Sequence, residues 1–457
     1  MTKTLDAHVS EADAFTLQLE RDPGLRATIV AVVVFDRSPD WARLVARMER
    51  ATHLIPTFRS VLVDTPLRLA PPRWVPDPDF DLSWHLRRIR LPEGSDLPEL
   101  LDQARTMGMD AFDHDRPMWE FTLVEGLPQG RAAWVLKVHH ALTDGIGGIQ
   151  IAAHVVDLER DAPPPSPVQP APRPRSPLPL EPLAEALGHD LRQATETASG
   201  ALRAAPGAAW RALRDPLGAL AGLGTEARSV LRMVRPVVET RSPVMVDRSH
   251  HRHFEAIDVP LGALADAAHR HGCSVNDAFL AGVAGGLRRY HQEHTACVNW
   301  LRVTMPISIR TADDDIAGTH VTLVRVDLPV GITDPVRRMR IVRELCTSER
   351  HEPAIAHSEA IAGVLNRLPV GFTAGMLHHV DLLASNVPGL EPTVYVAGAE
   401  VLSFHAFGAT LGSAANVTLM SYRGVCHVGV NTDGAAVPDP DRFAACLRDG
   451  FDEVLRA

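Results

Sequence analysis

The side chains best suited to chemistry in this sequence lie together in residues 139–145, which read His-His-Ala-Leu-Thr-Asp-Gly. The segment follows a strand-like run, 132–139, and precedes a stretch of helical periodicity. Because neighbouring residues on a strand point to opposite faces, only one of the two histidines can face a cleft squarely, while the other packs inward. An imidazole held there by carboxylate and backbone contacts suits general-base catalysis near neutral pH.

Three interpretations of this segment compete on its residues alone. A buried histidine pair beside a turn aspartate is the ordinary outcome for a His-His dipeptide. A metal site is disfavoured because adjacent histidines diverge and the turn supplies no third ligand. Base-assisted attack by a bound substrate is the third. Covalent catalysis is less favoured than this direct attack, since the sequence has no Gly-x-Ser-x-Gly elbow and no cysteine in its first half.

The elements that must position the segment alternate between strands and helices, which predicts a mixed α/β protein. In the first part we expect a strand buried on both faces, a helix capped by Ser38-Pro39, a second helix and a hairpin, at 28–35, 38–52, 96–109 and 118–139. In the last part we expect a strand at 253–259, helices from 261 and from a Ser274 cap to 290, and strands at 300–307, 320–328, 393–401, 416–422 and 425–431.

A proline-rich stretch separates these two parts. Ten of the twenty residues at 163–182 are proline, which excludes both helix and central strand. Helices are expected to follow at 183–205, 208–220 and 225–239, and residues 183–241 carry eight arginines against six acids. Packing across the two halves is favoured for these helices over lying on a lipid surface. The sequence therefore predicts an N-terminal domain at 1–162, a crossover at 163–245 and a C-terminal domain at 246–457.

The composition excludes several classes of protein. The chain has 457 residues, 46 Lys and Arg against 56 Asp and Glu, and a formal charge of −10, which disfavours nucleic acid as a partner. The five cysteines form no Cys-x-x-Cys pair, which favours a reducing cytoplasm over a disulfide framework. No signal peptide is visible, and the longest apolar stretch, 27–35, is about half a membrane span. Any membrane contact is therefore expected to be peripheral.

Beyond the segment at 139–145, five further motifs resemble those of one family. His-His-x-x-x-Asp-Gly is the signature of the chloramphenicol acetyltransferase-like superfamily, and the chain resembles its bacterial wax ester synthase/acyl-CoA:diacylglycerol acyltransferase branch. The branch's DPDFDxxxH, RPLWE, TVNDV, VPVSVR and SNVPG correspond here to 77–85, Arg116–Glu120 with Met118 for Leu, Ser274–Asp277, Met305–Arg310 and Ser385–Gly389. These motifs span nearly the whole chain outside the proline-rich stretch.

The resemblance implies two acyltransferase-like α/β domains with mixed sheets and flanking helices, and a channel that reaches the histidine pair from both faces. It makes His140 the general base and His139 its supporting neighbour. It makes Asp144 structural, ion-paired with Arg310, and Gly145 the residue that shapes the turn. Acyl-CoA is the implied donor and co-substrate, diacylglycerol or a long-chain alcohol the acceptor, and neither a cofactor nor a metal is expected.

The tetrahedral intermediate of acyl transfer needs hydrogen-bond donors, and no motif identifies them. Asn276 and Asn386 are candidates, although the first could merely lie in the first turn of a helix and the second in a turn. The resemblance adds Asp277 as a candidate substrate contact. For Trp119, a role in core packing is favoured over a role in the wall of a substrate tunnel. Thr319 stands where the family usually has Asn, which puts rate or acceptor choice in doubt.

Two rival functions remain open at this point. One is a condensation-type enzyme that uses a carrier-protein thioester, and the other is a lipid-binding relative without turnover. His378-His379 lies in a predicted helix without a following Asp-Gly and is not expected to form a second site, and residues 250–253 are expected at the surface. The expected location is the cytoplasm, with peripheral contact to a membrane or lipid droplet as a further hypothesis.

Overall fold

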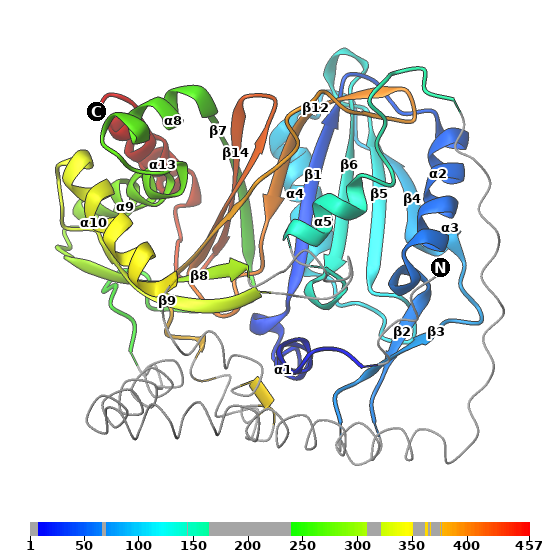
Figure 1. The fold of residues 1–457 in the computed structure, drawn as a ribbon, viewed down its shortest axis with the longest axis horizontal. Coiled ribbons are helices and arrows are strands. Elements are labelled where there is room, and N and C mark those ends of the chain that lie inside the picture. The colour runs from blue at the N-terminus through cyan, green and yellow to red at the C-terminus, as the bar shows by residue number, and fades with distance from the viewer. Residues whose placement is uncertain are drawn as a thin grey trace, which may run out of the picture.

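Two six-stranded sheets lie side by side in the protein, each with helices packed against it (Figure 1). The computed structural model describes residues 8–65, 70–143, 145–163, 239–308, 321–350, 362–363, 366, 375 and 377–457. The predicted proline-rich stretch beyond Pro163 and the three helices expected at 183–239 lie outside these residues, apart from residue 239 itself. The mixed α/β fold class predicted from the sequence is confirmed.

The first sheet carries the strand that leads into the histidine pair. Its strand order is β11-β12-β1-β6-β5-β4, and its strands are β1 (Thr28–Phe35), β4 (Leu86–Arg90), β5 (Trp119–Glu125), β6 (Ala132–His139), β11 (Tyr395–Val396) and β12 (Ala399–Phe407). The predicted strand at 28–35 and the predicted hairpin are both present, with β1 and β5 antiparallel to β6. A separate two-stranded ribbon joins β2 (Ser60–Val63) to β3 (Arg73–Pro76).

The second sheet comes entirely from the last part of the chain. Its order is β7-β14-β13-β10-β8-β9, and its strands are β7 (Arg252–Pro260), β8 (Trp300–Ser308), β9 (Val321–Pro329), β10 (Leu382–Val387), β13 (Ala415–Tyr422) and β14 (Val425–Asp433). Strand β10 pairs in parallel with both β13 and β8. Residues 385–387 of the predicted 385–389 motif therefore belong to a central strand, whereas composition alone made Asn386 a turn residue.

Several helices begin at a short polar side chain that caps them. The α-helices are α1 (Glu11–Leu19), α2 (Trp41–Leu54), α3 (Leu82–His85), α4 (Leu97–Met109), α5 (Gly145–Ala152), α8 (Leu261–Arg270), α9 (Val275–Glu293), α10 (Pro335–Arg350) and α13 (Pro440–Leu455). Such caps begin α1, α2, α3 and α9, and Ser274 caps α9 as predicted. The predicted Ser38 cap of α2 is wrong, because Asp40 accepts from the N–H of Arg43 and starts the helix two residues later. His378 and His379 lie in a turn instead of the predicted helix.

One segment crosses from the second half of the chain into the first sheet. The run predicted as one strand, 393–401, is broken by a two-residue turn, where Ala397 (φ 48°) and Gly398 (φ 88°) both take positive φ angles. Beyond this turn, β12 pairs antiparallel with β1, which places Val32 opposite His405. Strand β12 thus satisfies the edge of β1 that β6 leaves open, and β11 pairs with the far edge of β12. Both strands fall in the range predicted as a separate C-terminal domain, 246–457.

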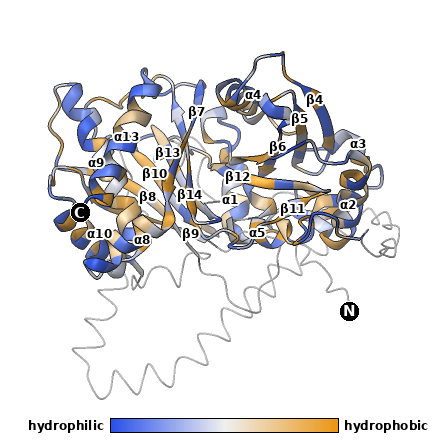
Figure 2. Cartoon of the chain, turned by 90° about the horizontal axis from the view of Figure 1, so that it is seen from above, coloured by the Kyte–Doolittle hydropathy of each residue, from blue (hydrophilic) through white to orange (hydrophobic). Residues whose placement is uncertain are grey.

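Hydrophobic residues predominate on strands such as β8 and β10, whereas the edge strand β4 is hydrophilic (Figure 2). The helices α8, α9, α10 and α13 form a layer against the second sheet (Figure 1). Where the two sheets meet, Phe254 of β7 stacks on Phe407 of β12, with ring centroids 4.3 Å apart. Within the described ranges, none of the helices combines the length and the apolar character that a bilayer crossing requires.

Candidate active site

The histidine pair lies where β6 ends and a short 3₁₀ turn, His140–Leu142, begins. The N–H of His139 donates to the carbonyl of Met118 at 3.0 Å, and the N–H of His140 donates to the carbonyl of Ala27 at 2.9 Å. These bonds tie the end of β6 to both of its neighbours. The backbone that presents the imidazoles is therefore held from two sides before α5 begins.

The two imidazoles have different surroundings, since His139 ends β6 and His140 begins the turn. His139 is completely buried, whereas His140 is partly exposed and lines a cavity of about 290 Å³. The cavity lies between the two sheets, and its apolar wall includes Trp134, Leu136 and Val138 of β6 with Leu383 of β10, Phe404 of β12 and Met420 of β13. A long apolar group in this cavity would lie against both halves of the protein, beside the imidazole of His140.

A carboxylate from far along the chain contacts the buried histidine. Oε1 of Glu20, the residue directly after α1, lies 2.9 Å from Nε2 of His139 and accepts from the N–H of Ala27 at 3.0 Å. Burial acts to raise the pKa of Glu20, but the His139 contact and the Ala27 N–H outweigh it and hold the pKa below its usual value. Glu20 is therefore ionised at neutral pH.

Of the two candidate oxyanion donors, Asn386 reaches the cavity wall and Asn276 stands behind it. Asn386 lies on β10 and lines the cavity together with His140. Its Nδ2 donates to Oδ1 of Asn276 at 3.3 Å, and Asn276 lies in the first turn of α9. The amide of Asn386 is thus oriented by its neighbour and retains a second N–H for another acceptor.

Two other predicted contacts have structural partners. Asp277 forms the capping box of α9, in which its Oδ2 accepts from the N–H and Oγ of Ser274 at 2.7 and 2.8 Å. Trp119 is fully buried and donates through Nε1 to the carbonyl of Phe58 at 2.9 Å. The Trp119 ring stacks between Phe58 and His85, with centroids 4.9 and 4.6 Å away. The packing interpretation of Trp119 agrees with this environment.

Three predicted residues lie outside the described part of the chain. These are Asp144, its expected partner Arg310, and Thr319. Gly145 is the first residue of α5. The expected ion pair and the effect of the missing family Asn therefore stay predictions.

Sequence reasoning missed Glu20 and most of the cavity wall. Glu20 has no motif around it, and the only signal was an acid at the end of a helix that precedes the strand 28–35. The aromatic wall residues Phe58 and Phe121 looked like ordinary core. His85, which entered only through the resemblance, is buried with its Nδ1 2.7 Å from the carbonyl of Trp119, and burial lowers its pKa.

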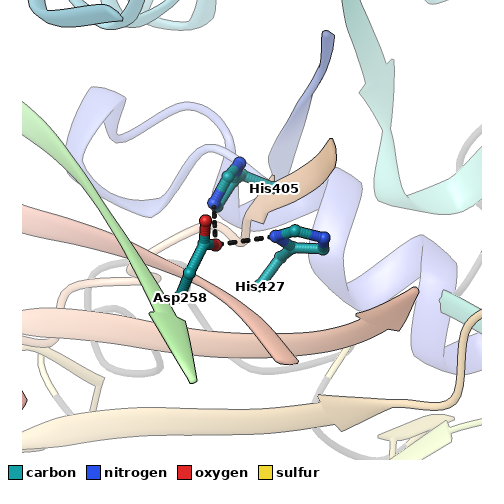
Figure 3. A group of neighbouring side chains, drawn as sticks. All are labelled: Asp258, His405 and His427. Atoms are coloured by element: carbon teal, nitrogen blue, oxygen red, sulfur yellow. Dashed lines mark hydrogen bonds and ion pairs between the residues drawn. The ribbon is translucent and has the colours of Figure 1, made fainter. Parts of the chain in front are cut away.

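A second histidine–carboxylate cluster lies at the junction of the two sheets (Figure 3). Oδ1 of Asp258, on β7, is 2.9 Å from Nε2 of His405 on β12 and 2.7 Å from Nδ1 of His427 on β14. Both rings are buried, and the three side chains are close enough to be considered as metal ligands. The shared oxygen and the hydrogen-bonding distances fit two imidazole N–H donors on one carboxylate acceptor.

Comparison with known proteins finds relatives of this chain over most of its length. The family model described as the wax ester synthase/diacylglycerol acyltransferase catalytic domain matches residues 9–279, and the model for the C-terminal domain of the same family matches residues 317–454. A Mycobacterium tuberculosis protein with the provisional name diacylglycerol O-acyltransferase is 40% identical over 440 residues, which cover 95% of this chain and 89% of that protein.

Solved structures show the same fold at lower identity. The wax ester synthase/diacylglycerol acyltransferase from Marinobacter aquaeolei is 21% identical and has a TM-score of 0.63. The match covers 98% of this chain and 98% of that chain. The first condensation domain of the CDA synthetase is 16% identical with a TM-score of 0.59, over 99% of this chain and 97% of that domain. The family-model matches and the 40% identity go further than the fold and bear out the resemblance in the motifs. The chain belongs to the wax ester synthase/diacylglycerol acyltransferase family.

Proposed function

We propose that this protein is an O-acyltransferase that moves a fatty acyl group from acyl-CoA to diacylglycerol or a long-chain alcohol, with His140 as the general base. One observation carries the proposal. The imidazole of His140 lies on the wall of an apolar cavity between the two sheets. An apolar chain buried in that cavity would bring its reacting end to a base, which is what acyl transfer to a hydroxyl requires.

The reaction follows from this placement. Nε2 or Nδ1 of His140 takes the hydroxyl proton while the acceptor oxygen attacks the thioester carbonyl carbon. The carbonyl oxygen becomes negatively charged, and the free N–H of Asn386 is the cavity-wall donor available to it. When the C–S bond breaks, the proton passes from His140 to the sulfur of CoA, so the products are an ester and free CoA. No cofactor takes part in this scheme.

The direct test offers palmitoyl-CoA with diacylglycerol and, in parallel, with hexadecanol, and resolves the lipid products by chromatography. We expect ester formation with at least one acceptor, and a loss of about 10²- to 10⁴-fold in kcat for His140→Ala. His53→Ala, on α2 beside Glu49, is the matched control and keeps parental turnover. Full activity of His140→Ala would overturn the base assignment.

The same assay separates the two rival functions. A palmitoyl-carrier protein replaces palmitoyl-CoA in one arm, because a condensation-type enzyme would prefer that donor. Isothermal titration of palmitoyl-CoA without product in any arm would identify a binding protein instead. Condensation domains share only the fold with this chain, since their identity is 16%. Acyl-CoA is therefore the donor that we propose.

We also propose that the protein meets its lipid substrates from the cytoplasm, by peripheral contact with a membrane or lipid droplet. The support is that the acceptors reside in lipid while the described helices include none suited to span a bilayer. Flotation of the purified protein with phosphatidylcholine vesicles that contain diacylglycerol tests this. We expect co-flotation with the vesicles, and recovery of all the protein in the dense fraction would contradict the proposal.

A further inference from the structure

The carboxylate of Glu20 contacts two separate parts of the frame that presents the histidine pair. Its Oε1 accepts from the N–H of Ala27 at 3.0 Å and lies 2.9 Å from Nε2 of His139. The carbonyl of the same Ala27 accepts the N–H of His140 at 2.9 Å. One oxygen atom of Glu20 is thus joined to His140 along two short routes, one through the backbone of Ala27, the residue before β1, and one through the buried ring of His139.

The hydrogen bonds of His139 define which nitrogen carries its proton. Nδ1 accepts from the N–H of Ala141 at 3.0 Å, so this nitrogen must present a lone pair. The ring proton therefore sits on Nε2, the nitrogen that lies 2.9 Å from Oε1 of Glu20. A carboxylate partner at this place selects the tautomer that the Ala141 bond needs. Without it, a proton on Nδ1 would oppose the N–H of Ala141 and open the turn that begins at His140.

We propose that Glu20 is a positioning residue for His140, and that it acts through the tautomer of His139 and through the peptide of Ala27. The inference rests on the proposed function, because it assigns Glu20 to the same base. Glu20 does not touch the reacting atoms in this scheme. It holds the 3₁₀ turn in the geometry that aims the imidazole of His140 into the cavity, as an outer partner orients a functional histidine in other sites.

A direct role in substrate binding is the rival explanation, since Glu20 also lines a second cavity. That cavity has a volume of about 410 Å³, and His114, whose Nε2 lies 4.0 Å from Oε2 of Glu20, lines it too. A binding role predicts that substitution of Glu20 raises KM. A positioning role predicts that kcat falls while KM stays nearly constant, because the substrate still binds but meets a misdirected base.

The experiment compares three variants in the palmitoyl-CoA assay. Glu20→Ala removes the acceptor and is expected to lower kcat about 10- to 100-fold, with KM for palmitoyl-CoA within about twofold of the parent. Glu20→Gln keeps an Oε1 that can accept from both Ala27 and His139, and is expected to recover kcat to within about fivefold. Asp22→Ala is the matched control: Asp22 accepts from the N–H of Gly24 and from His378, and its loss leaves kcat at the parental value.

A second measurement keeps the inference testable if Glu20→Ala fails to fold. Imidazole ¹⁵N chemical shifts report the tautomer of His139, and we expect Nε2–H in the parent and in Glu20→Gln. A kcat that survives in Glu20→Ala, a rise in KM in place of a fall in kcat, or a His139 tautomer with Nδ1–H in the parent would each overturn the inference. Absence of turnover in the parent, or turnover that His140→Ala leaves intact, overturns the proposed function instead, while the tautomer still tests the geometry.

Discussion

Among the described residues, two clusters bring a buried imidazole against a carboxylate, and one of them adjoins the apolar cavity between the sheets. In the first, Glu20 contacts His139 at a turn, and the next residue, His140, lines the cavity. In the second, Asp258 accepts from His405 and His427, all three from the interior of strands. Their chemical groups are nearly the same. What differs is that a turn exposes a second imidazole in one cluster, whereas strand pairing encloses both rings in the other.

The difference shows how backbone geometry decides whether a histidine lines the cavity or packs between the sheets. On β12, Phe404 and Ala406 line the cavity, so His405 between them points away from it, toward the second sheet. There it shares Asp258 with His427 (Figure 3). The same junction between the sheets contains the stack of Phe254 on Phe407. We infer that the first cluster serves turnover and the second holds the halves of the site together.

The largest expected effect separates the two clusters by activity. His140→Ala is expected to lower kcat by about 10²- to 10⁴-fold while the melting temperature stays within about 1 °C of the parent. His405→Ala is expected to do the reverse: kcat per folded molecule changes by less than about threefold, and the melting temperature falls. Steady-state kinetics with thermal unfolding of both variants decides. Equal losses of kcat in His140→Ala and His405→Ala would contradict the different roles inferred for the two clusters.

The role of the cavity can be tested further at Asn386, the candidate oxyanion donor in its wall. Asn386→Ala removes the amide that shares the cavity wall with His140, and we expect kcat to fall about 10²-fold, as when one such donor is lost elsewhere. Asn276→Ala removes only the neighbour that orients this amide and is expected to cost less than about tenfold. If both variants lose the same amount, Asn386 acts by packing with Asn276 and not as a donor to the substrate.

The contrast also explains how far sequence reasoning reached. The histidine pair was predictable because strand alternation and a following Asp-Gly are local features, and the capping box at Ser274 and Asp277 is local as well. Glu20 was not predictable, because the fold alone brings it to His139. The cluster of residues 258, 405 and 427 has no spacing pattern. It exists because β12 leaves its own half of the chain to pair with β1, which no local propensity requires.

The next prediction concerns the stability of the junction between the sheets, where Oδ1 of Asp258 accepts from both histidines. The side chain of Asp258 is 57% exposed, but both rings that donate to it are buried. Asp258→Ala leaves the two imidazole N–H groups without their acceptor, and we expect a loss of about 2 kcal/mol in the free energy of unfolding. Urea unfolding followed by fluorescence measures this loss. The control is Asp441→Ala, a strongly exposed carboxylate 3.8 Å from His253, for which the change stays within about 0.5 kcal/mol. Equal stability of the two variants would contradict the role of the junction.

A smaller effect is expected from pH. Burial tends to raise the pKa of Asp258, but the bonds from His405 and His427 outweigh burial and hold the pKa well below its ordinary value of 3.8. A carboxyl with a lowered folded-state pKa stabilises fully above its unfolded pKa and loses this contribution as pH falls toward the folded one. The difference in urea midpoint between the parent and Asp258→Asn should therefore persist near pH 5 and shrink below about pH 3.8. A difference that stays constant down to about pH 3 would be inconsistent with this linkage.

The smallest expected effect concerns metal binding at the junction between the sheets. Nδ1 of His405 and Nε2 of His427, the ring nitrogens turned away from Asp258, find no hydrogen-bond partner in the described ranges. Metal-bound histidines almost always donate through the second nitrogen, so two unpartnered ones favour protons, not a metal, between the rings and the carboxylate. We expect Zn²⁺, added in slight excess to EDTA-treated protein, to shift the melting temperature by less than about 1 °C. A rise of several degrees that disappears in His405→Gln would instead make this cluster a metal site.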